Sequence, residues 1–525
     1  MALAAPPRDV LIDEAPLETA DIVAIARGAK VALGPTARGR IAASRGVVDR
    51  LVAGDTLIYG LNTGLGHKRN ERLPLDMVET TQAVTVRLHA GGLGPPLPGE
   101  IVRAAMAVRI AGIARGGSGA SPAIAETYVE MLNAGITPVV PLVGSVGASD
   151  LMHMAAIALV AMGEGQAELE GRVLPGAEAL AAAGIEPTRL APKDGLTVIS
   201  ANGVSIGHAA LVVDRAQRVA DAADLVAAVS LEAIRGNLSI VDPVVAAAKP
   251  VAAQALVADR IRRFLAGSRL CTGTESVQDP LSFRVTPQVH GAFREVLRFA
   301  AGAVDSELAA MDDNPLVAID EDRMISNGNF HPMLLALSID ALRPALTHVG
   351  QLSDRRAGHI WDGIVADPEV FTPDGFEKIA SLGPPMVRYA GAAQAAELRT
   401  LAGPASLDVG PLDLGVEDHA TNATLAVRLT DQALDLVEDI LAVELLTAAA
   451  TVVTGAESRS LMGPRTRSAL DLVGATLAGF ERGAPSEKIH AAIRDLIDGP
   501  LLETAENVEI VGEGEAADEA ETARS

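Results

Sequence analysis

Four short segments of the chain combine glycine, asparagine or serine with an isolated titratable or charged side chain, a mixture that helices disfavour. They are residues 59–66 (YGLNTGLG), 144–150 (GSVGASD), 278–284 (QDPLSFR) and 327–331 (NGNFH). A tyrosine or histidine in such a loop can transfer protons, and an arginine can bind a carboxylate. We therefore expect these four segments to carry the chemistry of the protein.

None of the four segments has the pattern of a nucleotide or metal site. The first lacks the Lys-Ser/Thr ending of a phosphate-binding loop, and its glycine spacing is not that of a dinucleotide fingerprint. The ten histidines are scattered, without HExxH or a pair four residues apart. Cys271 is the single cysteine, which excludes an intrachain disulfide and a cysteine-based metal cluster. The sequence thus predicts no metal and no nucleotide cofactor.

The charge of the chain excludes an electrostatic nucleic-acid binder. Its 525 residues include 43 Lys and Arg against 67 Asp and Glu, a formal net charge of −24 at pH 7, and no basic stripe occurs. The apolar share of 49% would suit a membrane protein, but the sequence has no run of about 18 apolar residues. The first residues lack the basic region and the apolar core that are typical of a signal peptide. We therefore expect a cytoplasmic protein that binds neither nucleic acid nor membrane.

The pattern of apolar residues predicts a mainly α-helical protein. Up to about residue 204, Gly and Pro break the chain often, and helical segments alternate with polar loops. Long amphipathic stretches follow at residues 208–234, 287–311, 333–356 and 422–453. Helices of this length usually pack antiparallel. We expect a long central helix bundle beside a mixed, loop-rich N-terminal region that holds the active site.

This pattern suggests two domains and a tail. Residues 1–204 would carry the active site, and residues 205–505 would form the helical bundle. Six prolines between about residues 358 and 415 interrupt the helical pattern, which predicts a loop-rich excursion there. Residues 506–525 are acidic and lack large apolar side chains, so they predict a disordered tail.

Taken in order, these segments resemble the histidine, phenylalanine and tyrosine ammonia-lyase family. The resemblance runs from LIYGLNTGLG through VRIAGIARGGSG, LNAGITPVVPLVGSVGAS and PKDGLTVISANG to SVQDPLSFRVTPQVHG, MDDNPLV, SNGNFH and VEDHATN. One such motif is a weak signal, but the ordered set covers most of the chain and is specific. It implies a fumarase/aspartase-like architecture and a homotetramer whose active sites combine loops from several subunits.

The resemblance also implies a cofactor made from the backbone. Eliminating ammonia from an α-amino acid requires a base and an electron sink, and no ordinary side chain is a strong electrophile. In the family, an Ala-Ser-Gly tripeptide cyclises and loses two water molecules to give 4-methylidene-imidazol-5-one (MIO). Ala148 and Ser149 match the first two positions, and Ser149 would supply the methylene carbon.

The third position of this tripeptide departs from the family. The family reads Gly-Ala-Ser-Gly-Asp-Leu, whereas residues 147–151 read GASDL, so Asp150 either replaces the cyclising glycine or follows its deletion. Glycine tolerates the positive φ of such a tight loop, and aspartate carries a penalty of about 1 kcal/mol there. Aspartate is nevertheless among the residues least averse to that region. We expect MIO to form through the backbone nitrogen of Asp150.

Four further residues match family positions that act on the substrate. Tyr59 matches the catalytic tyrosine, the general base. Because an unperturbed phenol has a pKa of about 10, it needs cationic or dipolar neighbours to accept a proton at neutral pH. Arg284 matches the arginine that binds the substrate carboxylate, a task that suits its bidentate fork. Asn202 and Asn329 match asparagines that line the site, although the ISANG spacing is longer than the family's LINGT form.

In the family, substrate choice follows two adjacent residues after the tyrosine loop, which here are Leu88 and His89. Histidine-specific members carry Ser-His, tyrosine-specific members His-Leu and phenylalanine-specific members Phe-Leu. Glu417 resembles the acidic residue that histidine-specific members carry near the substrate amine. His89 and Glu417 therefore favour a histidine-like polar ring, whereas Leu88 does not. His89 would serve equally well as a structural residue.

Two family tyrosines are absent: Leu281 stands in place of one and Gly117 in place of the other. We expect an ammonia-lyase that converts an aromatic or histidine-like α-amino acid into an α,β-unsaturated acid. Two alternatives stay open. One is a 2,3-aminomutase of the same family, and the other is a non-cyclising homologue that binds a small amino acid without lyase activity.

Overall fold

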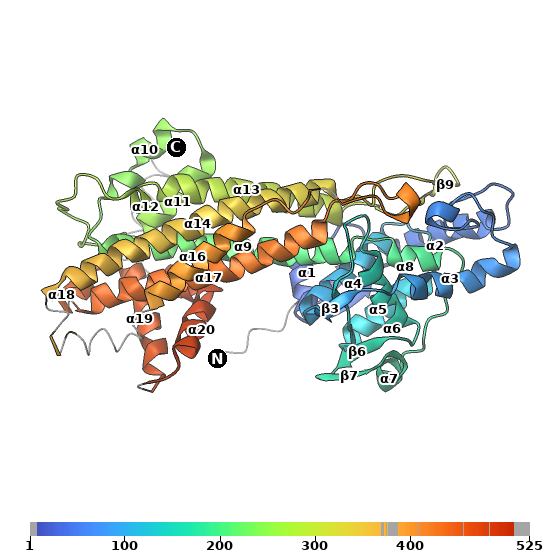
Figure 1. The fold of residues 1–525 in the computed structure, drawn as a ribbon, viewed down its shortest axis with the longest axis horizontal. Coiled ribbons are helices and arrows are strands. Elements are labelled where there is room, and N and C mark those ends of the chain that lie inside the picture. Colours follow the sequence, from blue (N-terminus) through green and yellow to red (C-terminus); the bar gives the residue numbers. More distant parts are fainter. Residues whose placement is uncertain are drawn as a thin grey trace. The chain divides into compact units, whose positions relative to one another are not determined.

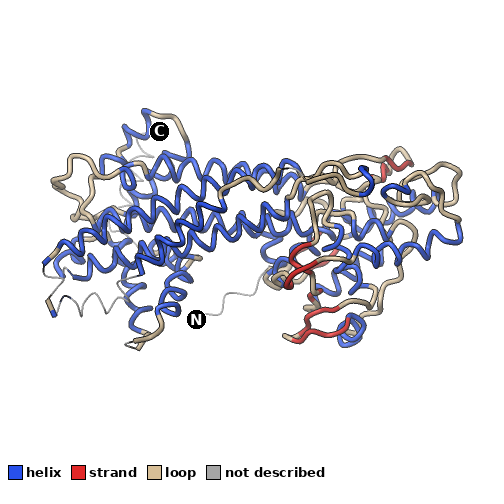
Figure 2. The backbone as a smooth tube through the Cα atoms, in the orientation of Figure 1, coloured by secondary structure: helices blue, strands red, loops and turns tan. Residues whose placement is uncertain are grey.

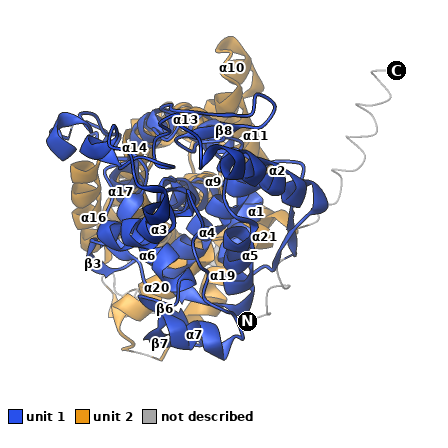
Figure 3. Ribbon diagram, turned by 90° about the vertical axis from the view of Figure 1, so that its right-hand side faces the viewer, with its two compact units in different colours: residues 1–214, 299–341, 404–430 blue, residues 215–298, 342–403, 431–525 orange. Residues whose placement is uncertain are grey.

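The chain forms two compact units, each assembled from several segments (Figure 3). The first unit comprises residues 1–214, 299–341 and 404–430, and the second comprises residues 215–298, 342–403 and 431–525. The computed structural model describes residues 8–368, 372–373, 375, 387–407, 409–454, 456–481 and 483–508. From residue 509 on, the expected tail lies outside the described residues. The domain boundary that we expect near residue 204 stays a prediction.

The protein is mainly helical, as the sequence predicts (Figure 1). Four long helices coincide with the amphipathic stretches and have residues in both units. They are α9 (Gly203–Ala233), α13 (Thr286–Leu308), α14 (Met333–Ala366) and α17 (Ala423–Thr454). Their parts in the second unit lie side by side as a bundle (Figure 1). The predicted fold class is therefore confirmed.

The first unit holds all the described strands, which are short (Figure 2). They are β1 (Val10–Ile12), β2 (Val31–Leu33), β3 (Leu93–Pro96), β4 (Thr137–Pro138), β5 (Pro141–Val143), β6 (Gln166–Leu169), β7 (Arg172–Pro175), β8 (Leu316–Ala318) and β9 (Arg323–Ile325). The β1–β2 pair is parallel, and the pairs β3–β5, β4–β6, β6–β7 and β8–β9 are antiparallel. The shorter helices of this unit are α1 (Thr19–Ala26), α2 (Pro35–Leu51), α3 (Leu75–His89), α4 (Gly99–Ala114), α5 (Pro122–Ala134), α6 (Leu151–Ala161), α7 (Gly176–Ala182) and α8 (Asp194–Ile199), with the 3₁₀ turns η1 (Gly66–Lys68) and η4 (Asp413–Gly415).

The second unit surrounds the bundle with shorter helices. They are η2 (Leu238–Val241), α10 (Pro243–Ala248), α11 (Ala252–Phe264), α12 (Leu281–Arg284), α16 (Val387–Leu401), α18 (Ala456–Leu461), α19 (Pro464–Ala478), α20 (Ser486–Ile497) and α21 (Pro500–Glu506). The stretch between residues 358 and 415, which we expect to be rich in loops, contains the end of α14 and all of α16. The prolines in that stretch fall outside these two helices, so they do not interrupt them.

Buried polar pairs fix how the bundle helices face one another. Arg356 of α14 binds the carboxylate of Glu444 of α17 through Nε at 2.5 Å and Nη2 at 2.9 Å, and both side chains are fully buried. Ser230 of α9 donates to the same carboxylate at 2.6 Å. Because a buried charge without its partner is costly, this arrangement disfavours any other register of the three helices.

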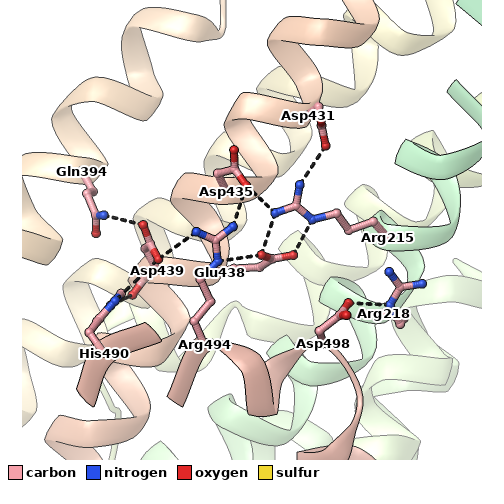
Figure 4. A network of polar contacts seen from close by, with 10 residues as sticks. All are labelled: Arg215, Arg218, Gln394, Asp431, Asp435, Glu438, Asp439, His490, Arg494 and Asp498. Atoms are coloured by element: carbon pink, nitrogen blue, oxygen red, sulfur yellow. Dashed lines mark hydrogen bonds and ion pairs between the residues drawn. The ribbon is translucent and has the colours of Figure 1, made fainter. Parts of the chain in front are cut away.

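A second polar network lies at the edge of the bundle, where α20 meets α9 and α17 (Figure 4). Arg215 of α9 and Arg494 of α20 both bind Asp435 and Glu438 of α17, at distances between 2.5 and 3.0 Å. Arg215 also binds Asp431 at 2.8 Å. Two guanidinium groups thus neutralise several carboxylates along one face of α17.

The described residues include one stretch, Asp194–Ala233, that is long and apolar enough to cross a membrane. However, 94% of its apolar window is buried inside the protein. Its apolarity is therefore explained by its central place in the fold.

Candidate active site

The loop at residues 144–150 follows β5 and ends where α6 begins. Two hydrogen bonds from the segment before α17 hold this loop in place. The N–H of Asn422 donates to the carbonyl of Val146 at 2.8 Å. The hydroxyl of Thr421 donates to the carbonyl of Gly147 at 2.8 Å. Gly147 has a φ of 81°, and a Cβ atom there would lie 2.1 Å from Oγ1 of Thr421. Only glycine allows this close approach, which holds the loop against a segment that is 274 residues away in the chain.

Asp150 is fully buried, and its carboxylate accepts three hydrogen bonds. Ser205, in the first turn of α9, donates its N–H to Oδ2 at 2.7 Å and its hydroxyl to Oδ1 at 2.8 Å. The hydroxyl of Ser145 donates to Oδ1 at 2.7 Å. The backbone N–H of Asp150 donates to the carbonyl of Ala201 at 2.8 Å. Asp150 has a φ of −90°, so the expectation of left-handed strain at this position is wrong.

The left-handed residue of the loop is Ser149, with a φ of 63°. Its side chain is buried, and its hydroxyl oxygen lies 3.4 Å from that of Ser200. Serine pays for this conformation with about 1–2 kcal/mol, which the surrounding hydrogen bonds offset. The tight turn is thus centred on the serine of the Ala-Ser-Asp tripeptide.

Several helices begin at this loop. Asp150 directly precedes α6, Ser205 lies in the first turn of α9, and Asn422 directly precedes α17. The unpaired N–H groups and the macrodipole of a helix give its N-terminus a partial positive charge. These helix starts therefore favour negative charge, and the buried carboxylate of Asp150 already lies among them.

Tyr59 begins a loop that the core of the first unit holds in place. Leu61 is fully buried against Val47, Val48 and Val317. The N–H of Gly66 lies 3.5 Å from the Tyr59 hydroxyl and donates to it.

The surroundings of Tyr59 raise the pKa of its phenol, first through burial and then through the negative charges of Glu417 and Asp413. The N–H of Gly66 and the more distant Arg69 act against these effects. The expected cationic activation is therefore outweighed in the free protein, where the phenol holds its proton.

Glu417 interacts electrostatically with Tyr59 and with His89, the second residue of the expected specificity pair at the end of α3. Burial raises the pKa of Glu417, Asp413 raises it further, and the charge of His89 acts in the opposite direction. Nδ1 of His89 lies 2.7 Å from the carbonyl oxygen of Thr85. Tyr59, His89 and Glu417 therefore occupy one neighbourhood. Leu88 is 79% exposed.

The two asparagines lie near the loops that meet at Ser149. Asn202, two residues after Ser200, is buried and donates through Nδ2 to the carbonyl of Phe330 at 2.9 Å. Among the described residues its Oδ1 has no hydrogen-bond partner. Asn329 is exposed, and its N–H donates to the side chain of Asn327 at 2.8 Å. Both therefore flank the chain that leads into α14.

Arg284 belongs to the second unit, whereas Tyr59, Ser149 and the two asparagines belong to the first. It ends α12, and its Nε is buried without a hydrogen-bond partner within the part of the chain that the structure describes. Ser282 Oγ and Gln288 Oε1 are also buried and unpaired among the described residues. These three unpaired polar atoms belong to α12 and to the first turn of α13.

The two positions that lack family tyrosines differ in their surroundings. Leu281 begins α12 and is 60% exposed. Gly117 lies against Leu316 and Met311, and a Cβ atom there would approach them to 2.7 and 2.9 Å. These side chains fill the space beside Gly117, so the structure holds no room for a large side chain there.

Sequence reasoning missed several residues that hold the site. Ser145, Ser200, Ser205 and Thr421 contact the tripeptide or its flanks. His331, in the segment 327–331 that the sequence analysis singled out, has its Nε2 2.8 Å from Nδ1 of His419. Ser200 was within the matched ISANG segment and could have been singled out from it. Ser145 lies in the segment 144–150 and Thr421 in the matched VEDHATN segment, whereas Ser205 lies outside the singled-out segments and left no local signal.

Comparison with known proteins accounts for these features. The family model described as aromatic amino acid lyase matches residues 17–475, which is most of the chain. The chain belongs to the aromatic amino acid lyase family. A histidine ammonia-lyase from Gloeobacter violaceus is 36% identical over 505 residues, which cover 95% of this chain and 97% of that protein. Membership makes this protein a carbon–nitrogen lyase.

Solved structures agree with this membership. A tyrosine aminomutase from Streptomyces globisporus has a TM-score of 0.86 and 27% identity, and the match covers 96% of this lyase and 99% of that chain. Ergothionase, an ergothioneine-degrading enzyme from Treponema denticola, has a TM-score of 0.84 and 26% identity, covering 96% of this lyase and 100% of that chain. The fold is therefore shared with enzymes that carry out lyase and aminomutase reactions.

Proposed function

We propose that this lyase eliminates ammonia from an α-amino acid with a histidine-like polar ring and releases the α,β-unsaturated acid. The observation that carries the proposal is the braced, tight turn at Ser149, whose buried hydroxyl lies among the starts of three helices. Loops of this kind are the place where the family makes its electrophile. The similarity to a histidine ammonia-lyase and the His89–Glu417 neighbourhood support the polar ring.

The residues present fit an MIO group made from Ala148, Ser149 and Asp150. A Cβ atom at the third position would be an obstacle if the position needed a left-handed conformation, but the left-handed residue is Ser149. The side chain of Asp150 has its own polar surroundings in Ser145 and Ser205. Ring closure would cost the hydrogen bond from Asp150 N–H to Ala201, a contribution of about 1 kcal/mol.

When formed, the group would supply the electrophile that makes ammonia a better leaving group. The residues of this chain would do the remaining work. The helix starts around Ser149 would favour the negative charge that develops there. A substrate ammonium between Tyr59 and Glu417 would lower the pKa of the phenol, because a cation favours the phenolate. The Tyr59 oxygen could then accept the β-proton.

Other residues would hold the substrate. Arg284 would bind its carboxylate, which would satisfy the unpaired Nε atom. Asn202 and Asn329 would line the site, with Oδ1 of Asn202 available to a donor. Glu417 and His89 would contact the amine and the polar ring, and Leu88 would border the ring. From the resemblance to the family, we further propose a homotetramer that shares its sites between subunits and acts in the cytoplasm.

A substrate screen tests this function. The purified protein would be incubated with L-histidine, L-phenylalanine and L-tyrosine, and both the ultraviolet absorbance of the unsaturated acid and the released ammonia would be measured. We expect equal amounts of the two products, with the highest kcat/KM for histidine or a close analogue. Tyr59→Phe should abolish the activity. Binding of an amino acid without either product would favour the non-cyclising alternative instead.

The tyrosine aminomutase similarity favours a second candidate, a 2,3-aminomutase. Such an enzyme would retain the unsaturated acid and add ammonia back at the β-carbon. Chromatography of the same reactions would then show a β-amino acid without net ammonia release. A product mixture dominated by the β-amino acid would replace the lyase proposal with this one.

A further inference from the structure

The loop that carries Tyr59 is tied to the segment that carries Glu417 by a pair of residues outside the proposed reacting groups. Oδ2 of Asp413 accepts the backbone N–H of His67 at 2.8 Å, and Oδ1 lies 2.7 Å from Nδ1 of His67. Both carboxylate oxygens of Asp413 therefore contact the same loop residue, His67. The two partners are 346 residues apart in the chain.

The loop side of this contact leads directly to Tyr59. Gly66 precedes His67, and its N–H donates to the Tyr59 hydroxyl. Gly66 has a φ of 55°, and a Cβ atom there would lie 1.9 Å from Oδ2 of Asp413. Only glycine lets the backbone approach the carboxylate so closely. The position of the Tyr59 hydroxyl is thus coupled to the position of Asp413.

The other side of the contact leads directly to Glu417. Leu412 and Glu417 form an antiparallel bridge, in which the N–H of Leu412 donates to the carbonyl of Glu417 at 2.7 Å. The turn between them has left-handed φ values at Asp413, Leu414 and Gly415. Left-handed conformations of non-glycine residues cost about 1–2 kcal/mol each and persist where contacts hold them. The two contacts between Asp413 and His67 hold this turn in its left-handed conformation.

We propose that His67 and Asp413 form a latch, which positions the phenol of Tyr59 against the carboxylate of Glu417. The catalytic part of this inference rests on the proposed function. The latch side chains are partly exposed, 47% for His67 and 28% for Asp413. Partly exposed contacts contribute less free energy than buried ones, so the latch acts mainly by fixing the geometry of the two segments. His67 and Asp413 act through Tyr59 and Glu417, and they are positioning residues.

The latch is tested in the full-length protein with His67→Ala, Asp413→Ala and the double variant. The control is Asp418→Ala, which removes an exposed carboxylate of the same segment. The first readout is the alkaline titration of the Tyr59 phenol by ultraviolet absorbance, with no substrate present. The sequence has three tyrosines, so subtracting the matching Tyr59→Phe variant isolates this phenol.

We expect the Tyr59 phenol to titrate at lower pH in each single latch variant, because an open loop hydrates it. His67→Ala is the more decisive variant, since it removes none of the carboxylates that raise the pKa of Tyr59. The double variant should titrate like Asp413→Ala, because loss of the carboxylate already breaks both contacts with residue 67. The control should titrate like the parent. An unchanged titration in His67→Ala would overturn the latch.

The second readout is turnover. In the latch variants we expect kcat to fall by about 10-fold to 100-fold with a small change in KM, because the base is misplaced while substrate contacts remain. A kcat equal to that of the parent would remove the catalytic role of the latch. If the parent turns over no amino acid, the proposed function fails. The substrate-free titration still decides whether the latch exists.

Discussion

Ser205 contacts both carboxylate oxygens of Asp150, with its N–H 2.7 Å from Oδ2 and its hydroxyl 2.8 Å from Oδ1. This contact joins the loop at residues 144–150 to the first turn of α9. The aspartate at which this chain departs from the family's tripeptide is thus bound by a residue 55 positions further along the chain.

The Ser205 hydroxyl should make a measurable contribution to stability. Ser205→Ala removes one hydrogen bond to a buried, charged acceptor, and such bonds contribute about 2 kcal/mol. Urea unfolding of the two proteins would measure this loss. Ser306→Ala is the control, because its hydroxyl donates to Gly302 from an exposed position. The control should change the free energy of unfolding by less than about 0.5 kcal/mol. Equal losses in the two variants would contradict the role of Ser205.

The network on α17 predicts a large effect of Arg215 (Figure 4). Arg215→Met leaves Asp431, Asp435 and Glu438 with less neutralising charge, and Glu438 is only 4% exposed. Only Glu438 is buried, and Arg494 still binds it and Asp435, so we expect a loss of about 2 kcal/mol. We expect added salt to recover part of this loss, because it screens the remaining carboxylates.

The control for Arg215 is Arg298→Met. Arg298 binds Glu295 through a side chain that is 79% exposed. Exposed pairs of this kind contribute about 0–1 kcal/mol. Thermal unfolding at two salt concentrations would compare the variants. A Tm for Arg215→Met that matches that of Arg298→Met would show that the network contributes no special stability.

Glu307 predicts a specific dependence of stability on pH. Burial raises its pKa to about 7, and the charge of Asp312 adds to the shift. Between about pH 4.5 and pH 7 the folded protein therefore binds this proton more tightly than the unfolded chain. Stability from this group is present below pH 4.5 and is lost as the pH rises through 7.

Glu307→Gln removes the titratable carboxyl group and, with it, this dependence of stability on pH. Between about pH 5 and pH 8 the free energy of unfolding of the parent should fall by about 2 kcal/mol more than that of the variant. Glu321→Gln, at an exposed position, should follow the parent. Urea unfolding at the two pH values makes the comparison. Parallel changes in the parent and in Glu307→Gln would contradict the assignment.

Substrate preference should depend on Glu417. Glu417→Gln removes the negative charge that would face a polar ring or an amine, and it leaves the size of the side chain unchanged. We expect kcat/KM for histidine to fall by about tenfold or more relative to phenylalanine. Asp418→Asn removes a neighbouring exposed charge and should preserve the ratio. A preserved ratio in Glu417→Gln would show that another group selects the ring.

The long helices could be predicted from the sequence because their apolar period repeats over many residues. The stretches at residues 208–234 and 422–453 match α9 and α17 closely. Between residues 358 and 415 the prolines led us to expect loops, yet the structure also contains α16 there. Prolines mark where a helix cannot continue, but they do not exclude helices on either side, such as α16.

The site could be predicted in part. Tyr59, Ser149 and Asp150 lie in segments whose composition is unusual for helices, and that signal is local. The φ of 63° at Ser149 and the partners of Asp150 could not be predicted, because contacts with α9 determine them. The pair His67 and Asp413 likewise depends on the meeting of two distant loops.

The central claim is that Ala148, Ser149 and Asp150 form an MIO group without the family's glycine. The most direct test is the mass of the tryptic peptide 116–172 from the purified native protein, since no Lys or Arg lies inside it before Arg172. Ser149→Ala is the control, because it removes the hydroxyl that would leave as water. The account predicts a parent peptide lighter than its sequence by two water molecules and an unmodified control. A parent peptide with the full mass of its sequence would contradict it.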